Sequence, residues 1–271
     1  MRILVLGGGG FIGCHVTRAL VEAGHSLRVF GRRGAAVPAS LPGVESLVGD
    51  LADPKAVASA LRGVETVCHL ISTTSPATAE LDPLADVQGN LVGTLGLLEE
   101  MRRQGIGRLV FLSSGGTVYG PTDQVPIPET HPLNPIGSYG IVKTAIEGFL
   151  AREARSGLAP VVLRASNAYG PRQGRGDFLG FIGTTLLNLA EGKPVEIFGD
   201  GAVIRDFVHV RDLAALTLRA VSATAPVTVN AGSGRGHSLN AVLTLIEEVT
   251  GRKVPVIRRP GRAIDVPVSV L

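Results

Sequence analysis

The sequence has 271 residues, of which 45% are hydrophobic, and this is enough for one large α/β domain with a substantial core. The formal net charge of +3 comes from arginines spread along the chain, and only 4% of the residues are aromatic, which argues against a nucleic-acid-binding face. No segment is apolar over the length of a membrane span, and the N-terminal apolar run is too short for a signal peptide, so we expect a cytoplasmic protein.

Strand-like and helix-like segments alternate through the first two thirds of the sequence. Short β-branched runs predict strands at residues 3–6, 27–30, 66–71, 109–112 and 161–164. Helical periodicity predicts helices at residues 11–23, 54–61, 91–103 and 139–155. This alternation is typical of a parallel sheet that is covered on both faces. We therefore predict a Rossmann-like α/β fold with a doubly wound parallel sheet.

The strict alternation is lost after about residue 170. The helices predicted beyond this point lie at residues 178–191, 212–221 and 239–250. We expect a Rossmann domain over residues 1–170, with strand and helix contributions up to about residue 235. Residues 171–271 are then mainly a smaller C-terminal α/β lobe.

The two cysteines give no sign of a metal site or a disulfide. Cys14 and Cys68 both lie in apolar surroundings, and their spacing matches no metal-ligand pattern. We therefore expect two reduced cysteines in the core and no bound metal.

The segment GGGGFIG, residues 7–13, follows the first predicted strand and leads into a predicted helix. A tight turn of this kind needs positive φ and an uncrowded main chain, so that a diphosphate can approach the first helical N–H groups. Gly7, Gly10 and Gly13 carry this argument, and Gly13 also lets the helix pack closely on the sheet. We expect Gly8 and Gly9 to tolerate substitution better. A tight turn without a ligand is the alternative.

The pattern G-x-x-G-x-x-G is similar to that of the extended short-chain dehydrogenases/reductases, the NAD-dependent epimerase/dehydratase family. Further motifs follow in the family's order: GDL at Gly49, HLIS at His69, NLVGTLGLLE at Asn90, SSGGTVYG at Ser113, SYGIVK at Ser138, SNAYGPRQ at Ser166, FGDG at Phe198, RDFVHVRDLA at Arg205 and RAIDVP at Arg262. Together they cover nearly the whole chain and most resemble the UDP-hexose 4-epimerases. The resemblance implies that residues 1–170 bind NAD or NADP and that the lobe binds a nucleotide sugar.

Tyr139 and Lys143 are four residues apart on a predicted helix, so their side chains share one face. A phenol with a pKa of about 10 is a poor base at neutral pH, but a nearby ammonium and a positive nicotinamide ring favour the phenolate. Tyr139 can then take a proton from a substrate hydroxyl while hydride leaves the same carbon. An ordinary solvent-facing pair is the alternative.

The third catalytic group does not stand at its usual position. The resemblance places a Ser or Thr where this sequence has Gly115. We expect Ser114 to supply the hydroxyl, assisted by Thr117, and the alternative is that Ser113 and Ser114 only cap the end of the preceding strand. Dehydratases of this family carry an Asp-Glu pair at Gly116 and Thr117. The absence of an acid there implies that elimination of water has no proton donor.

The cofactor contacts that the resemblance implies are Gly7, Gly10, Phe11, Ile12, Gly13, Gly31, Arg32, Arg33, Asp50, Leu51, Leu70, Ile71, Ser113, Tyr139 and Lys143. Among them, Asp50 would contact the adenine amino group. NAD-preferring enzymes tend to place an acidic residue at the end of the second strand, where this chain has Gly31, Arg32 and Arg33. Arginines suit a 2′-phosphate, unless they point to water. The residues thus favour NADP and the resemblance favours NAD.

The substrate contacts that the resemblance implies are Ser114, Thr117, Asn167, Phe198, Gly199, Arg205, Arg262 and Ser269. Arg205 and Arg262 would hold the diphosphate, because a guanidinium donates two parallel hydrogen bonds to it. Phe198 and Gly199 would lie against the uracil, and the small Ser269 would leave room for an acetamido group on the sugar. The alternative is that these arginines form structural ion pairs, for example between Arg205 and a neighbouring aspartate.

The leading hypothesis is a UDP-hexose 4-epimerase that works through a transient 4-keto sugar and retains its cofactor. A reductase of nucleotide 4-ketohexoses that consumes NADPH is an alternative, and so is a cofactor-binding regulatory protein without turnover. The resemblance also implies a homodimer with a four-helix interface formed by residues 91–103 and 139–155. Relatives continue beyond Leu271, so we expect either a shortened chain or a reduced lobe.

Overall fold

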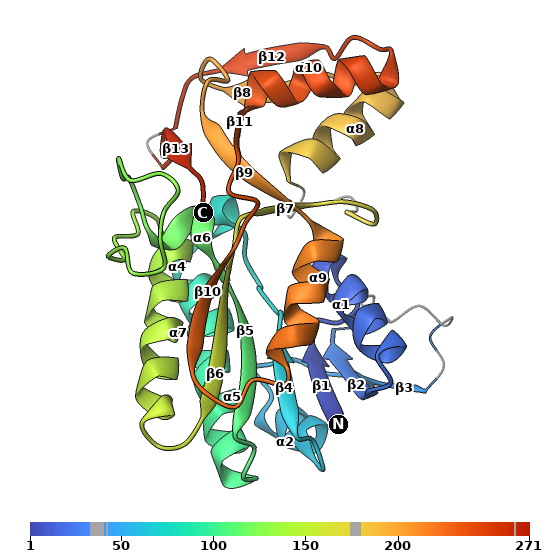
Figure 1. The fold of residues 1–271 in the computed structure, drawn as a ribbon, viewed down its shortest axis with the longest axis vertical. Coiled ribbons are helices and arrows are strands. Elements are labelled where there is room, and N and C mark those ends of the chain that lie inside the picture. The colour runs from blue at the N-terminus through green and yellow to red at the C-terminus, as the bar shows by residue number, and fades with distance from the viewer. Residues whose placement is uncertain (33–40, 42, 174–179, 263) are drawn as a thin grey trace.

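A seven-stranded parallel sheet forms the larger part of the molecule (Figure 1). The computed structural model describes residues 1–32, 41, 43–173, 180–262 and 264–271. From one edge to the other, the strands are β10 (Val227–Ala231), β6 (Ala159–Ala165), β5 (Arg108–Ser114), β4 (Thr66–His69), β1 (Arg2–Leu6), β2 (Ser26–Gly31) and β3 (Val44–Val48). The strand order reverses direction between β1 and β4, which is the switch point where ligands bind in folds of this kind.

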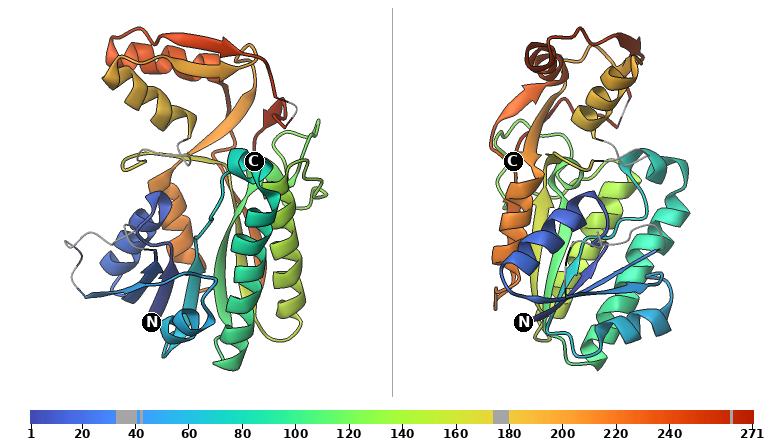
Figure 2. Two further views of the ribbon diagram at one scale, coloured as in Figure 1. Left: turned by 180° about the vertical axis from the view of Figure 1, so that it is seen from behind. Right: turned by 90° about the vertical axis from the view of Figure 1, so that its right-hand side faces the viewer.

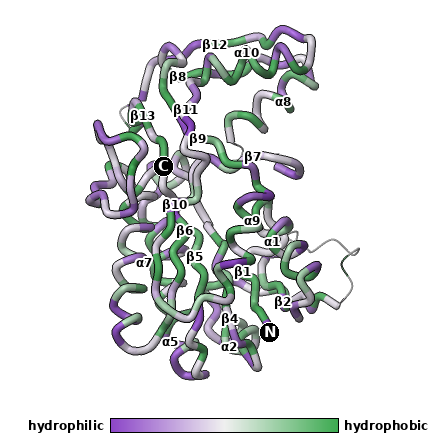
Figure 3. The backbone as a smooth tube through the Cα atoms, in the orientation of Figure 1, coloured by the Kyte–Doolittle hydropathy of each residue, from purple (hydrophilic) through white to green (hydrophobic). Residues whose placement is uncertain are grey.

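Helices cover both faces of this sheet, as its apolar strands require. Strand β1 shows why: Leu4 and Leu6 enter the core on one face, while Ile3 and Val5 enter the core on the other. The first face is covered by α2 (Pro54–Leu61), α5 (Gly93–Arg103) and α7 (Ser138–Ala154), and the second by α1 (Phe11–Glu22) and α9 (Val210–Ala220). Figure 3 shows hydrophobic residues concentrated along β1, β4 and β5.

Short helices line the end of the sheet where β4 and β5 stop. They are α3 (Pro76–Leu81), α4 (Pro83–Asp86), the π-helical turn η1 (Val87–Val92) and α6 (Gly115–Val118). Helix η1 continues directly into α5, so the helix predicted at 91–103 begins earlier than expected. No helix within the described ranges is long and apolar enough to cross a membrane.

A smaller lobe stands over this end of the sheet (Figures 1 and 2). One part is a four-stranded sheet of β7 (Asn167–Tyr169), β9 (Ile204–His209), β11 (Gly236–Ser238) and β13 (Val268–Ser269). The other part pairs β8 (Val195–Phe198) with β12 (Val256–Arg259) and packs them against α8 (Phe181–Glu191) and α10 (Leu239–Thr250). The chain passes back to the main sheet between these parts, as α9 and β10.

The five predicted strands are confirmed as β1, β2, β4, β5 and β6, and the doubly wound α/β fold with them. Strand β4 ends at His69 rather than at residue 71, because Leu70 and Ile71 turn toward a cavity. Cys14 and Cys68 are free thiols buried in the core. Burial raises the pKa of Cys68 to about 12, which leaves it an unreactive thiol.

Candidate active site

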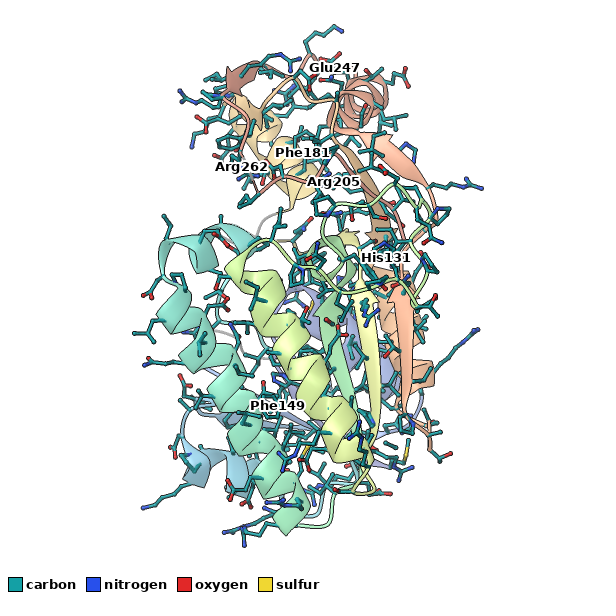
Figure 4. The ribbon with its side chains drawn as sticks, turned by 90° about the vertical axis from the view of Figure 1, so that its left-hand side faces the viewer. His131, Phe149, Phe181, Arg205, Glu247 and Arg262 are labelled. Atoms are coloured by element: carbon teal, nitrogen blue, oxygen red, sulfur yellow. The ribbon has the colours of Figure 1, made fainter. Side chains whose placement is uncertain are left out.

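A cavity of about 880 Å³ lies between the carboxyl ends of the sheet strands and the smaller lobe. Residues that follow β1, β2, β4 and β5 line its floor, and α7 lines one side. The lobe contributes Arg205, Arg262 and the segment 264–266. Figure 4 shows Arg205 and Arg262 on the side of the lobe that faces the main sheet. The cavity therefore has the position expected of a ligand site in an open α/β sheet.

The strand-to-helix turn after β1 opens onto this cavity. Gly7 has φ +82°, a conformation that favours glycine, and its carbonyl accepts the N–H of Gly10 at 3.0 Å. A Cβ at Gly13 would overlap the Gly7 carbonyl oxygen, so helix and turn can approach this closely only with glycine there. No side chain caps α1, and Phe11 and Ile12 line the cavity with the three glycines. The positive end of the helix is thus open to a diphosphate, and the turn fits a dinucleotide.

The expectation that Gly8 tolerates substitution is wrong. Gly8 is buried under the first turn, and a Cβ there would lie 2.8 Å from the Thr17 hydroxyl and 2.9 Å from the Val29 side chain. Contacts this short force a neighbour to move. Gly8 therefore serves the packing of α1 on β2.

The predicted nucleoside contacts that the structure describes all line the same cavity. They are Gly31, Arg32, Asp50, Leu51, Leu70 and Ile71. Arg32 is exposed at the end of β2, and Asp50 accepts the N–H of Ala52 at 2.9 Å with one carboxylate oxygen. Arg33 lies outside the described residues. The cavity thus extends from the glycine turn to the end of β2, where a ribose and a base can be bound.

Tyr139 and Lys143 lie in the first two turns of α7 and both line the cavity. The Lys143 ammonium is 5.5 Å from the centre of the Tyr139 ring and 4.8 Å from the centre of the Phe111 ring. It donates a hydrogen bond of 3.0 Å to the carbonyl of Leu112 in β5. Only 3% of the surface of Lys143 is exposed, so its charge acts inside the protein and not in solvent.

Burial shifts the pKa values of both groups, in opposite directions. It raises the pKa of Tyr139, and a hydrogen bond with Ser72 works against this rise. It lowers the pKa of Lys143 to about 8, although the negative charges of Asp86 and Glu147 raise it. Burial, rather than the ammonium that the sequence argument invoked, therefore dominates the pKa of this phenol.

Three of the hydroxyl groups in the cavity lining come from β5 and α6. Ser113, Ser114 and Thr117 line the cavity, and Thr117 donates to the carbonyl of Ser114 at 3.4 Å. A side chain at Gly115 would not reach this cavity, because its Cβ would overlap a methyl group of Leu271. The Ser113 hydroxyl donates to Glu147 at 2.5 Å, so of these three hydroxyls Ser114 and Thr117 are the ones left for a ligand.

The two arginines of the lobe approach the cavity in different ways. Arg205 donates to the carbonyl of Val266 at 2.7 Å, and burial lowers its pKa. Arg262 forms a two-pronged ion pair with Asp265, at 2.8 and 2.9 Å, and its guanidinium lies 4.3 Å from the centre of the Phe198 ring. Both guanidiniums keep further N–H donors, which can bind a diphosphate in the way that arginine pairs do.

The expected alternative of structural ion pairs is found for Arg262, with Asp265, but no ion pair joins Arg205 to Asp206 or Asp212 in the described part of the chain. The buried carboxylate of Asp206 instead accepts the N–H groups of Ser233, Gly234 and Leu271, at 2.8, 3.1 and 3.3 Å. Asp206 therefore joins β9 to the two segments beside it.

The remaining predicted substrate residues divide between the cavity and its surroundings. Asn167 lines the cavity and donates to the carbonyl of Asp206 at 3.0 Å. Phe198, Gly199 and Ser269 are not among the lining residues. Phe198 lies under Arg262, and Ser269 is buried in β13, paired with β9. The structure thus brings five of these eight residues to one cavity.

One group of lining residues was missed in the sequence. It lies between β4 and α3 and in the first turns of α3, and it consists of Ser72, Thr73, Thr74, Ser75, Pro76, Ala77 and Glu80. Ser75 caps α3 in a reciprocal pair with Thr78, and Pro76 begins the helix. A Ser-Pro helix start a few residues after a buried strand was the available signal, since such a start places its polar groups at the carboxyl edge of the sheet.

Comparison with known proteins agrees with this site. A family model described as the NAD dependent epimerase/dehydratase family matches residues 3–232. A putative UDP-glucose 4-epimerase of Methanocaldococcus jannaschii is 33% identical, over 92% of this chain and 82% of that protein. Two solved structures of UDP-glucose 4-epimerases each match the whole of this chain with a TM-score of 0.94. The one from Thermotoga maritima, with UDP-glucose, is 35% identical, and the match covers 89% of its chain. The one from Thermus thermophilus, in complex with NAD, is 34% identical, and the match covers 90% of its chain. The chain therefore belongs to the NAD-dependent epimerase/dehydratase family.

Proposed function

We propose that this protein is an NAD-dependent UDP-hexose 4-epimerase. The observation that carries the proposal is one cavity that is lined together by the glycine turn, by the Tyr139–Lys143 pair and by Arg205 and Arg262. In this proposal the main sheet holds the cofactor and the smaller lobe holds the nucleotide diphosphate. The similar structures with bound NAD and UDP-glucose support it.

Tyr139 is the proton acceptor and donor in this reaction. Its phenolate takes the proton of the sugar 4-hydroxyl, and the phenol formed in this way returns a proton to the same oxygen, so the protein gains and loses none overall. The Lys143 ammonium, held by the Leu112 carbonyl, stabilises the phenolate while it exists. Ser114 lines the same cavity, and its hydroxyl binds the same substrate oxygen in this proposal. NAD bound along the glycine turn supplies the hydride acceptor and donor that inversion at a carbon requires.

The choice between NAD and NADP depends on the end of β2. Gly31 leaves no carboxylate there for a ribose 2′-hydroxyl, and Arg32 lines the cavity. This observation favours the second candidate function, an NADPH-dependent reductase of nucleotide 4-keto sugars. We propose NAD for the epimerase because the similar structures include complexes with NAD. Calorimetric titration with NAD and NADP, in the parent and in Arg32→Ala, distinguishes the two.

Turnover distinguishes the candidate functions. The purified protein is incubated with NAD and UDP-glucose, UDP-galactose or UDP-N-acetylglucosamine, while NMR follows the sugar configuration and absorbance follows the cofactor. We expect inversion at C4 with no net change in cofactor. Stoichiometric oxidation of NADPH with a keto sugar would instead establish the reductase, and binding without turnover would establish a regulatory protein.

Tyr139→Phe tests the assignment of the proton-transfer group. We expect the rate of inversion to fall by a factor of about 100 or more, because the variant cannot accept a proton. Tyr169→Phe is the matched control, since Tyr169 contacts the His209 ring and does not line the cavity. A Tyr139→Phe enzyme that kept the parent rate would show that another group transfers the proton.

We also propose that the protein forms a homodimer through α5 and α7. The two helices lie side by side on one face of the sheet (Figure 4), and a shallow cavity of about 290 Å³ between them includes Leu95 and Phe149 in its lining. Val92, directly before α5, and Ile141, in α7, are exposed large apolar residues. Two such pairs of helices can pack as a four-helix bundle.

A further inference from the structure

A buried carboxylate beside the proton-transfer pair has no role in the mechanism above. Asp86 ends α4 and has no exposed surface. Its Oδ1 accepts from the Thr74 hydroxyl at 2.7 Å and from the Asn90 amide at 2.8 Å, and its Oδ2 accepts from the Ser138 hydroxyl at 3.0 Å. All three partners donate, which is the arrangement that a buried carboxylate requires.

The Ser138 contact connects this carboxylate to the catalytic helix. Ser138 is the first residue of α7 and directly precedes Tyr139. Its N–H is bound by the Glu80 carboxylate at 2.6 Å, so carboxylates from α3 and α4 hold the two polar groups of one residue. The residue before α7 is Gly137, which has no side chain to cap the helix. These two bonds therefore fix the start of the helix and with it the position of the Tyr139 phenol.

The remaining bonds of the cluster hold Asp86 itself. The Asn90 amide also donates to Thr74 at 2.9 Å, and its oxygen accepts the N–H of Thr73 at 2.8 Å. Asn90 lies in η1, one turn after Asp86. Each of these hydrogen bonds joins two groups of the protein, and together they can stabilise a charge at this buried position.

The charge of Asp86 acts on both members of the pair. It raises the pKa of Lys143 and the pKa of Tyr139. It therefore favours the ammonium of Lys143 and the protonated phenol of Tyr139. The other ionisable groups around the pair are Glu147 on α7, which is paired with Arg164, Glu80 on α3, and His69 on β4, whose pKa burial lowers to about 3. His69 is neutral over the working range, so its charge does not change there.

We propose that Asp86 is a positioning residue, which places Tyr139 through Ser138 and keeps Lys143 charged through its own buried carboxylate. The proposal rests on the proposed function, because it assigns Asp86 a role in the same proton transfer. It also predicts a change in the titration of Tyr139, which can be measured without turnover. The role of Asp86 and the proposed function can therefore fail separately.

The test compares three variants in the pH dependence of kcat for UDP-glucose with NAD present. Asp86→Asn keeps the shape and the bonds from Thr74 and Asn90, and the Ser138 hydroxyl can reverse to accept from the new amide. Only the charge is lost. Because the titrations of Tyr139 and Lys143 are coupled, the acidic and the basic limb of the plot of kcat against pH should both move to lower pH, by about one pH unit.

Ser138→Ala keeps the charge and loses one hydrogen bond. We expect kcat to fall about fivefold, with both limbs of the profile in place and KM nearly unchanged. Asp82→Asn is the matched control: Asp82 is the exposed cap of the same helix, α4, and solvent screens its charge. Its profile should equal that of the parent. A lower kcat in Asp86→Asn with unmoved limbs would show a merely structural role and overturn the proposal.

The measurement without turnover is an NMR titration of Tyr139, which is practical because the chain has few aromatic residues. The chain has three tyrosines and no tryptophan, so ¹³C-labelled tyrosine gives three ring signals, and Tyr139→Phe identifies one of them. With NAD bound, the Tyr139 signal should titrate at lower pH in Asp86→Asn than in the parent. Equal titrations would overturn the role of Asp86 even in an active epimerase. A shifted titration in a protein without turnover would leave that role standing and remove the epimerase assignment.

Discussion

At the scale of single residues, Gly13 gives the sharpest prediction. An added Cβ would overlap the Gly7 carbonyl oxygen, and because both atoms belong to the main chain no change of rotamer relieves the contact. Gly13→Ala should therefore lower the free energy of unfolding by about 2 kcal/mol and abolish NAD binding. Chemical denaturation and calorimetry measure the two effects.

Gly96→Ala is the control for this substitution, because Gly96 is an exposed helical glycine with no atom near its missing Cβ. It should bind NAD as the parent does and be more stable by up to about 1 kcal/mol. If Gly13→Ala bound NAD with parent affinity, the close approach of α1 to the turn would not be what shapes the cofactor site.

The glycines also show how far the site could be predicted from the sequence. The spacing of Gly7, Gly10 and Gly13 depends on local geometry alone, and these residues do line the cavity. The roles of Gly8 and Gly115 depend on Thr17 and Leu271, which reach them only in the folded chain. Motif spacing therefore predicts contacts with a ligand better than it predicts contacts between distant parts of the protein.

At the scale of elements, the contact between β4 and α5 should make stability depend on pH. His69 is buried in β4, its Nε2 lies 2.9 Å from the Thr94 hydroxyl of α5, and burial lowers its pKa to about 3. The unfolded chain takes up this proton near pH 6.5, and the native protein does not until about pH 3. The unfolded state therefore binds more protons between these values, and stability decreases as the pH falls below 6.5.

Between pH 7 and pH 5 this one group should account for a loss of about 2 kcal/mol in the free energy of unfolding. Urea denaturation at the two pH values measures it. In His69→Gln, which keeps a polar group near Thr94, that part of the pH dependence should vanish. In His237→Gln, at an exposed position, it should remain. An equal pH dependence in parent and His69→Gln would mean that His69 is already charged in the native protein.

The elements differed in how well they could be predicted. Helix α2 has the predicted bounds, because Asp53 caps it through the N–H groups of Lys55 and Ala56, and Pro54 begins it. Strand β10 was missed, because its partner β6 lies far back along the chain and local sequence does not specify such pairing. The strands of the smaller lobe were missed for the same reason.

At the scale of the whole molecule, the chain passes repeatedly between the main sheet and the lobe. It leaves the sheet after β6, returns as α9 and β10, and leaves again as β11 (Figure 1). The buried Asp206 carboxylate binds N–H groups on both sides of this path, from Ser233 after β10 and from Leu271 after β13. The cavity between the two parts is thus held by contacts that no single stretch of sequence contains.

The proposed homodimer can be tested at two exposed glycines, where a side chain can be added without disturbing the fold of the monomer. Gly96 of α5 and Gly148 of α7 are exposed, and no atom lies within 4 Å of a Cβ built at either position. Gly148→Arg should therefore leave the monomer intact and even favour the helix by up to about 1 kcal/mol. In a four-helix interface, however, the long charged side chain would block the close approach of the partner's helices. We expect Gly148→Ala to remain dimeric and Gly148→Arg to be monomeric in light scattering at matched concentration, with equal or higher resistance to urea in the monomer. A dimeric Gly148→Arg would show that the interface lies away from α7.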